Sequence, residues 1–191
     1  MHTLTWCKQL YLSIEFLSNY DYSKKIESNR ADHLIYNLEN YLIRLNSVYD
    51  RILQVVNAVF HLCVNEECVS HSVIVSNYKV QHNLEIQNSI KKIKKFLKDY
   101  AQTRYTLIHK HSWQDLKLRK IELFYLNDLV DPQKSDEWKK GFKQYRARFL
   151  GDYISEKKTE FKEINTQLAN LINDLFNLFQ NEYTNQKAKL S

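Results

Sequence analysis

The clearest feature of this chain is an apolar residue that recurs at alternating steps of four and three. The repeat is most regular between residues 34 and 62. Its members there are Leu34, Leu38, Tyr41, Leu45, Val48, Ile52, Val55, Val59 and Leu62, with a second row of Ile35, Leu42, Tyr49 and Val56 beside them. A heptad pattern of this kind predicts one long helix that packs nearly parallel to its neighbours over its whole length.

Similar patterns predict helices over residues 4–18, 84–101 and 154–183. Ser112 is expected to cap a further helix that ends before Asp131 and Pro132. Ser135 is expected to open another helix, which Gly151 would bend or end. Residues 65–81 show no clear period and are predicted to form an excursion or a loop.

The composition agrees with a helical fold. The 191 residues include only two glycines and one proline, so helix breakers and tight turns are few. We therefore predict an all-α fold, an antiparallel helical bundle with long heptad-patterned helices. One domain is expected to span residues 1–191, with a core at about 29–130 and C-terminal helices at 135–183 packing on it.

No targeting or membrane segment is recognised in the sequence. Trp6, Lys8 and Glu15 interrupt the N-terminal residues in a way that is unlike a signal peptide. The most apolar run, residues 52–64, is too short to cross a bilayer as a helix. The expected location is therefore the cytoplasm, with no membrane partner, and the three cysteines are expected to be reduced thiols.

One residue breaks the apolar pattern of the helix predicted from residue 84. Its stripe consists of Ile86, Ile90, Ile93, Leu97 and Tyr100. The next position in phase is Arg104, and a buried guanidinium is costly unless it is paired or hydrated. The arginine therefore indicates either a kink that turns it outward or a polar pocket that uses it.

His109 follows Arg104 by five positions. On a straight helix these two side chains diverge by about 140°. They share a site only at a helix break, or where two copies of the chain meet.

An arginine, four residues and a histidine, placed between helices of a small bundle, resemble the defining motif of the HEPN superfamily. The resemblance covers about residues 29–130 and implies an all-helical, commonly dimeric protein. Many HEPN domains are metal-independent ribonucleases of toxin–antitoxin, antiphage or RNA-processing systems. Two positions depart from the family: Tyr105 stands where Asn, Asp or His is common, and His111 stands where some toxins carry a tyrosine that a partner enzyme modifies. That form of regulation is therefore not expected.

The resemblance and the chemistry of the residues lead to one hypothesis for the site. Histidine titrates near neutral pH, so His109 is assigned as acid and base, and the guanidinium of Arg104 would hold the scissile phosphate. Tyr105, Lys110 and His111 are assigned supporting roles, and no metal or cofactor is expected. The structural alternative is a capping arginine and a half-buried histidine.

The leading functional prediction is a metal-independent endoribonuclease that cleaves RNA by attack of the 2′-hydroxyl. It would act as a homodimer and as a toxin or antiphage-defence effector, with RNA as substrate and an antitoxin protein as a further candidate partner. The alternative is a catalytically silent helical module for protein interaction or oligomerisation, which would use its long heptad helices as the interface.

Basic residues supply candidate RNA contacts. The net charge is +6 and the isoelectric point is near 9.0, which gives weak support for a polyanionic partner. The exposed face of the helix that leads to Arg104 consists of Lys91, Lys92, Lys94, Lys95 and Lys98. Of these, Lys91, Lys94, Lys95 and Lys98 are the candidate RNA contacts. Residues 138–149 interleave aromatic and basic side chains, which fits either contact with single-stranded RNA or a helix face that packs on the core.

A last cluster contains His61, Cys63, Cys68 and His71. These are potential zinc ligands, but their spacing matches no standard zinc site. Cys63 falls in phase with the second apolar row, so it is predicted to lie in the core. We therefore predict no metal here and favour free buried thiols.

Overall fold

The computed structural model describes residues 2–18, 29–109, 115–126 and 135–190. Within these ranges, the side chains of residues 2, 3, 99, 101–109, 186, 189 and 190 lie outside the description. The elements are α1 (His2–Phe16), α2 (Arg30–Val59), the 3-10 helix η1 (Glu66–Cys68), α3 (His71–Ser76), α4 (Tyr78–Gln81), α5 (Leu84–His109), α6 (Leu116–Leu126) and α7 (Asp136–Leu190). The described residues contain no strand, which confirms the all-α prediction.

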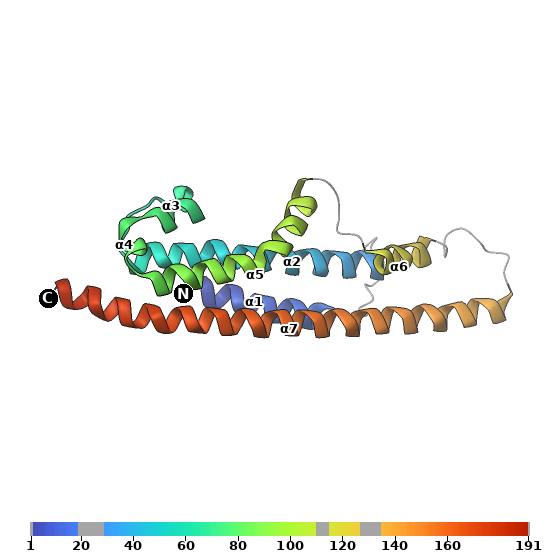
Figure 1. Cartoon of the computed structure of the whole chain (residues 1–191). Helices are drawn as coiled ribbons and strands as arrows, with labels where there is room; N and C mark the ends of the chain where they lie inside the picture. The colour runs from blue at the N-terminus through green and yellow to red at the C-terminus, as the bar shows by residue number, and fades with distance from the viewer. Residues whose placement is uncertain (1, 19–28, 110–114, 127–134, 191) are drawn as a thin grey trace.

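The helices form an elongated bundle (Figure 1). α2 is central: it packs against α1 on one side and α5 on another, and it also contacts α6 and α7. α7 runs along the whole molecule, antiparallel to α5, and α3 and α4 cover the end where α2 finishes (Figure 1). Consecutive long helices run in opposite directions, as predicted for an antiparallel bundle.

The regular apolar row of α2 forms the centre of the core. Leu34, Leu38, Tyr41, Leu45, Val48 and Ile52 are all fully buried. The helix begins with a capping box, in which the Asn29 side chain accepts from the backbone N–H groups of Ala31 and Asp32, and the Asp32 carboxylate accepts from that of Asn29. The predicted helix is confirmed, although it ends at Val59, before the last member of the row.

Of the two alternatives for residues 65–81, the loop is wrong for most of their length, because they contain η1, α3 and α4. The segment is an excursion at one end of the long helices (Figure 1). The side chains of Asn65, Ser70 and Asn77 cap these three elements in turn. Each element has at most six residues, so an apolar period has no room to repeat. Ile74 and Val80 are buried and attach the segment to the bundle.

The expectation that Gly151 bends or ends a helix is also wrong. α7, which is 55 residues long, continues through Gly151. A glycine inside a helix costs only about 1 kcal/mol relative to alanine. Its neighbours Leu150, Tyr153 and Ile154 are buried against the bundle, and that burial outweighs the glycine penalty. The start of α7 is as predicted, with the Trp138 N–H donating to Ser135 Oγ at 3.4 Å.

α6 begins at Leu116, later than expected. Asp115 caps it: the backbone N–H of Leu118 donates to Asp115 Oδ1 at 2.6 Å. Ser112, the predicted cap, lies outside the described residues. The sequence signal at residues 112–115 therefore marked a helix start, and the acid of that signal acts as the cap.

Candidate functional site

Arg104, Tyr105 and His109 lie on the final turns of α5, and His109 is its last residue. The first part of the same helix packs in the core, where Ile86, Ile90, Ile93 and Leu97 are buried. Figure 1 shows that α5 then bends, and that its last turns project away from the bundle. The backbone of α5 is thus kinked, which was one of the two alternatives that Arg104 indicated in the apolar stripe. The side chains of Arg104, Tyr105 and His109, and all of Lys110 and His111, lie outside the described part.

A buried amide from α2 is bonded to α5 just before this segment. Asn46 Nδ2 donates to the carbonyl oxygens of Tyr100 and of Leu42, both at 2.9 Å. Asn46 is only 6% exposed, so its amide has no access to bulk water in place of these partners. Side chains that bond to helix carbonyls are a known cause of helix bends. Asn46 therefore fixes α5 four residues before Arg104.

A second polar anchor lies just after the segment, where α6 begins. Asp115 Oδ2 accepts from the Tyr153 hydroxyl at 2.9 Å and lies 3.8 Å from Lys157 Nζ. Lys157 also binds Glu160 Oε2 at 2.8 Å. Burial and the neighbouring Asp115 carboxylate hold the pKa of Tyr153 far above its usual range, so the tyrosine stays a donor. Polar contacts thus hold the chain to the bundle at Tyr100 and again at Asp115.

The sequence analysis did not identify Asn46, Asp115, Tyr153 or Lys157 as positioning residues. The available signal was an asparagine directly beside Leu45 of the buried row, since a polar group in such a place needs a partner. That partner is 54 residues away along the chain, and no local pattern identifies it.

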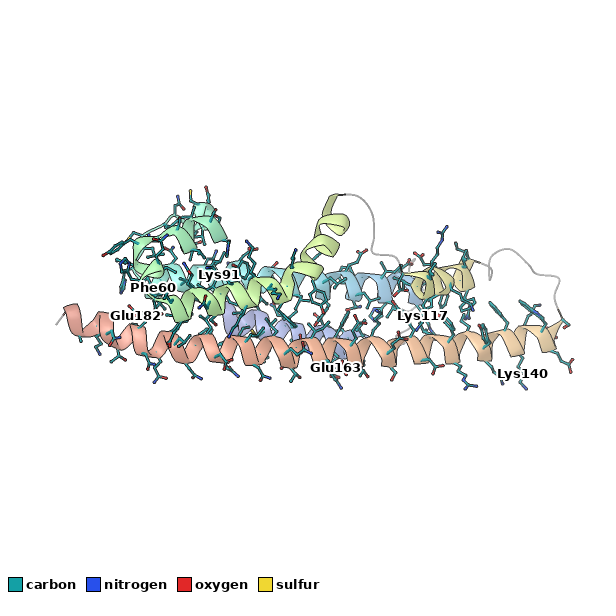
Figure 2. All side chains as sticks on the ribbon, in the orientation of Figure 1. Phe60, Lys91, Lys117, Lys140, Glu163 and Glu182 are labelled. Carbon is teal, nitrogen blue, oxygen red and sulfur yellow. The ribbon has the colours of Figure 1, made fainter. Side chains whose placement is uncertain are left out.

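The four candidate lysines of α5 are all exposed, and their immediate surroundings differ. Lys94 and Lys91 act on His71 of α3, whose pKa is lowered first by burial and then by these two charges. Figure 2 labels Lys91 on this part of α5. Lys95 instead lines an open hollow of about 490 Å³ between α5 and α7, together with Lys92, Phe96, Tyr100 and Leu171. Lys92 belongs to the exposed lysine face recognised in the sequence, whereas Phe96 was not recognised there.

The aromatic residues of segment 138–149 pack mainly on α6. Phe124 meets Phe142, Tyr145 and Phe149 edge-on, with ring centroids 5.6, 5.7 and 5.5 Å apart. Lys120 Nζ lies 4.9 Å from the centre of the Phe149 ring. These contacts agree with a packing face, which was one of the two predicted alternatives.

The predicted burial of the cysteines is wrong. Cys63 and Cys68 are exposed and Cys7 is half-buried. α2 ends at Val59, and Cys63 then adopts a left-handed φ of 56°, so the apolar phase of the helix no longer applies to it. His71 Nδ1 is hydrogen-bonded to the Tyr49 hydroxyl at 2.5 Å. In the described part of the chain, no three His, Cys, Asp or Glu side chains gather in a metal-binding arrangement.

The bundle, the kinked helix and its arginine–histidine pair define a class of all-helical HEPN proteins. A family model described as HEPN_Cthe2314-like HEPN matches residues 7–177, and the chain belongs to this family. The match extends from α1 far into α7 and includes Arg104 and His109. No curated protein matches the chain, and no solved structure does. Among the described residues, none of the helices combines the length and apolarity needed to span a bilayer.

Proposed function

We propose that this protein is a metal-independent endoribonuclease of the HEPN type. The observation that carries the proposal is the placement of Arg104 and His109 on the part of α5 that leaves the bundle, within the range matched by the HEPN family model. Its role would be that of a toxin or antiphage-defence effector, with an antitoxin protein as its regulator.

In the proposed reaction, His109 removes the proton from a ribose 2′-hydroxyl. The 2′-oxygen then forms a bond to phosphorus, and the bond from phosphorus to the 5′-oxygen breaks. A histidinium protonates the leaving 5′-oxygen, which yields a 2′,3′-cyclic phosphate and a 5′-hydroxyl. Arg104 stabilises the charge that develops on the phosphorane oxygens.

A homodimer supports this chemistry better than a monomer. One helical turn covers 3.6 residues, so Arg104 and His109 do not fall on the same side of a regular helix. Two copies of the projecting α5 segment would supply two histidines and two arginines to one cleft. One histidine would then act as base while the other acts as acid.

The second candidate is a catalytically silent interaction module. The end of the bundle formed by α6 and the start of α7 exposes large apolar side chains: Leu123 is 50%, Leu126 55% and Trp138 45% exposed. An apolar surface of this kind is typical of protein interfaces. An interaction module of this kind requires no chemistry from Arg104 or His109.

Cleavage of RNA in EDTA separates the two candidates. Purified wild-type protein and the His109→Ala variant would be incubated with a mixed pool of single-stranded RNA, and product lengths would be followed over time. The proposal expects cleavage by the wild type and a loss of at least a hundredfold in the variant. Equal cleavage by both proteins would remove His109 from the reaction, and no cleavage by a confirmed dimer would favour the interaction module.

A further inference from the structure

The hollow between α5 and α7 combines positive charge with aromatic surface. Lys92 and Lys95 are exposed at its rim, and Phe96, Tyr100 and Leu171 are half-buried in its wall. The rings of Phe96 and Tyr100 lie 6.2 Å apart and are tilted by 53°. The volume of about 490 Å³ is open to solvent on a broad side, so the hollow suits part of a long ligand better than an enclosed small molecule.

The hollow leads directly to the proposed catalytic segment. Lys92, Phe96, Tyr100 and Arg104 follow one another at steps of four on α5, which is about one helical turn per step. From Lys92 to Arg104 the distance along a straight helix is about 18 Å, and the bend shortens it. A chain that lies in the hollow therefore continues onto the segment that carries Arg104 and His109.

Charge and shape together identify the class of ligand. Among the side chains that the structure describes, none forms an ion pair with Lys92 or Lys95. Unneutralised lysines beside aromatic rings are the elements with which proteins hold single-stranded nucleic acid: the ammonium groups bind phosphates and the rings stack on bases. A duplex hides its base faces and cannot use the rings.

We infer that this hollow is a subsite for single-stranded RNA next to the cleaved phosphate. A base stacks on the ring of Phe96 with the tilted ring of Tyr100 beside it, and the phosphates on either side of the base contact Lys92 and Lys95. The inference rests on the proposed ribonuclease function, because it names the path by which the substrate reaches Arg104. Residues of α7 form the opposite wall through Leu171.

The test measures binding without cleavage. A fluorescein-labelled 2′-O-methyl RNA carries no 2′ proton to remove, so its fluorescence anisotropy reports affinity alone. The double variant Lys92→Gln with Lys95→Gln is compared with the matched control Lys8→Gln with Lys162→Gln, which removes two exposed lysines of α1 and α7. Phe96→Leu keeps apolar volume but removes the stacking face, and thermal melting checks that each variant is folded.

The expected result is a loss of affinity of at least tenfold for the Lys92 and Lys95 variant, with a smaller loss for the control. The slope of log affinity against log salt should fall by about 1.4 for two lost phosphate contacts, at about 0.7 for each contact with a single strand. Phe96→Leu should weaken binding by at least about fivefold, the lower end of what loss of one stacked base costs.

Three results would overturn the subsite: no binding by the wild type, equal losses in the lysine variant and its control, or an equal loss when Lys91 and Lys94, which do not line the hollow, are replaced. The cleavage assay on unmodified RNA is separate. Wild-type protein that binds through the hollow but cleaves no RNA would disprove the nuclease and leave the subsite standing.

Discussion

The two parts of α5 differ sharply although they belong to one helix. Up to Leu97, every fourth or third side chain is an isoleucine or leucine, and these residues are buried against α2 and α7. Beyond Tyr100 the next position in phase is Arg104, and the helix leaves the bundle (Figure 1). Burial of each apolar side chain in the first part contributes about 1.5–3 kcal/mol, whereas burial of a guanidinium is unfavourable.

This difference shows how one charged residue in phase with a core stripe marks the point where a helix stops packing on the bundle. The core does not hold the last turns, and Asn46 and Asp115 fix the chain on either side of them. Polar residues that packing would otherwise bury thereby become available to a ligand. Substitutions in the packed part of α5 and in its projecting part should therefore have different effects.

Arg104→Leu should remove the difference between the packed and the projecting parts of α5, because leucine continues the apolar stripe. RNA cleavage in EDTA should fall by about a hundred- to a thousandfold, because the donors that stabilise the phosphorane are gone. Thermal melting should show no loss of stability, since leucine fits the phase of the packed part. Arg104→Lys is the matched control and should recover only part of the activity, because lysine keeps the charge but lacks the paired donors. Full cleavage by Arg104→Leu would contradict the assignment.

Ile93→Ala should affect the packed part alone. Ile93 is fully buried, and truncation of such a side chain to alanine costs about 2–5 kcal/mol in the free energy of unfolding. Its exposed neighbour, changed as Lys94→Ala, should cost no more than about 0.5 kcal/mol. Urea unfolding followed by circular dichroism measures both. Equal stability of the two variants would mean that this face of α5 is not the core face.

Asn46→Ala should loosen the junction between the two parts. The carbonyls of Tyr100 and Leu42 each lose a donor, and the expected cost is about 1–3 kcal/mol in unfolding free energy. Cleavage should also fall, because the arginine–histidine segment loses its anchor. The adjacent Ser47→Ala is the control: Ser47 Oγ donates only within α2, to Ile43 O at 2.9 Å. If both variants retain full stability and activity, Asn46 does not position the segment.

The smallest expected effect is a pH dependence at His71. Burial and the charges of Lys94 and Lys91 lower its pKa in the folded protein, so the folded state binds a proton less readily than the unfolded state. The contribution of His71 to stability is therefore complete above the ordinary histidine pKa of about 6.5 and declines as the pH falls below it. Urea midpoints at pH 7.5 and 5.5 should differ less for His71→Gln than for the wild type. An identical difference in both proteins would refute this.

The sequence was sufficient to predict most of the fold, and it offered a kink near Arg104 as one of two alternatives. The row from Leu34 to Ile52 repeats often enough to identify α2, and Arg104 marked where the stripe of α5 fails. Shorter elements and exceptions were missed for physical reasons. α3 and α4 are too short for a period, and the burial around Gly151 outweighs its weak helix propensity.

The positioning residues of the site could not be predicted. Asn46 meets Tyr100 only after α2 and α5 pack together, and Tyr153 meets Asp115 across 38 residues of chain. The surroundings of the α5 lysines have the same origin: the charges of Lys94 and Lys91 lower the pKa of His71 in α3, and Lys95 lines a hollow with Leu171 of α7. A helical pattern defines which residues share a face, and the tertiary fold decides what that face meets.

In the proposed function, the projecting end of α5 cleaves RNA through His109. The most direct measurement maps the ends of the products that wild-type protein and His109→Ala release from RNA in EDTA. We expect 2′,3′-cyclic phosphates and 5′-hydroxyls from the wild type alone. Ends with a 5′-phosphate, or the same products from His109→Ala, would contradict it.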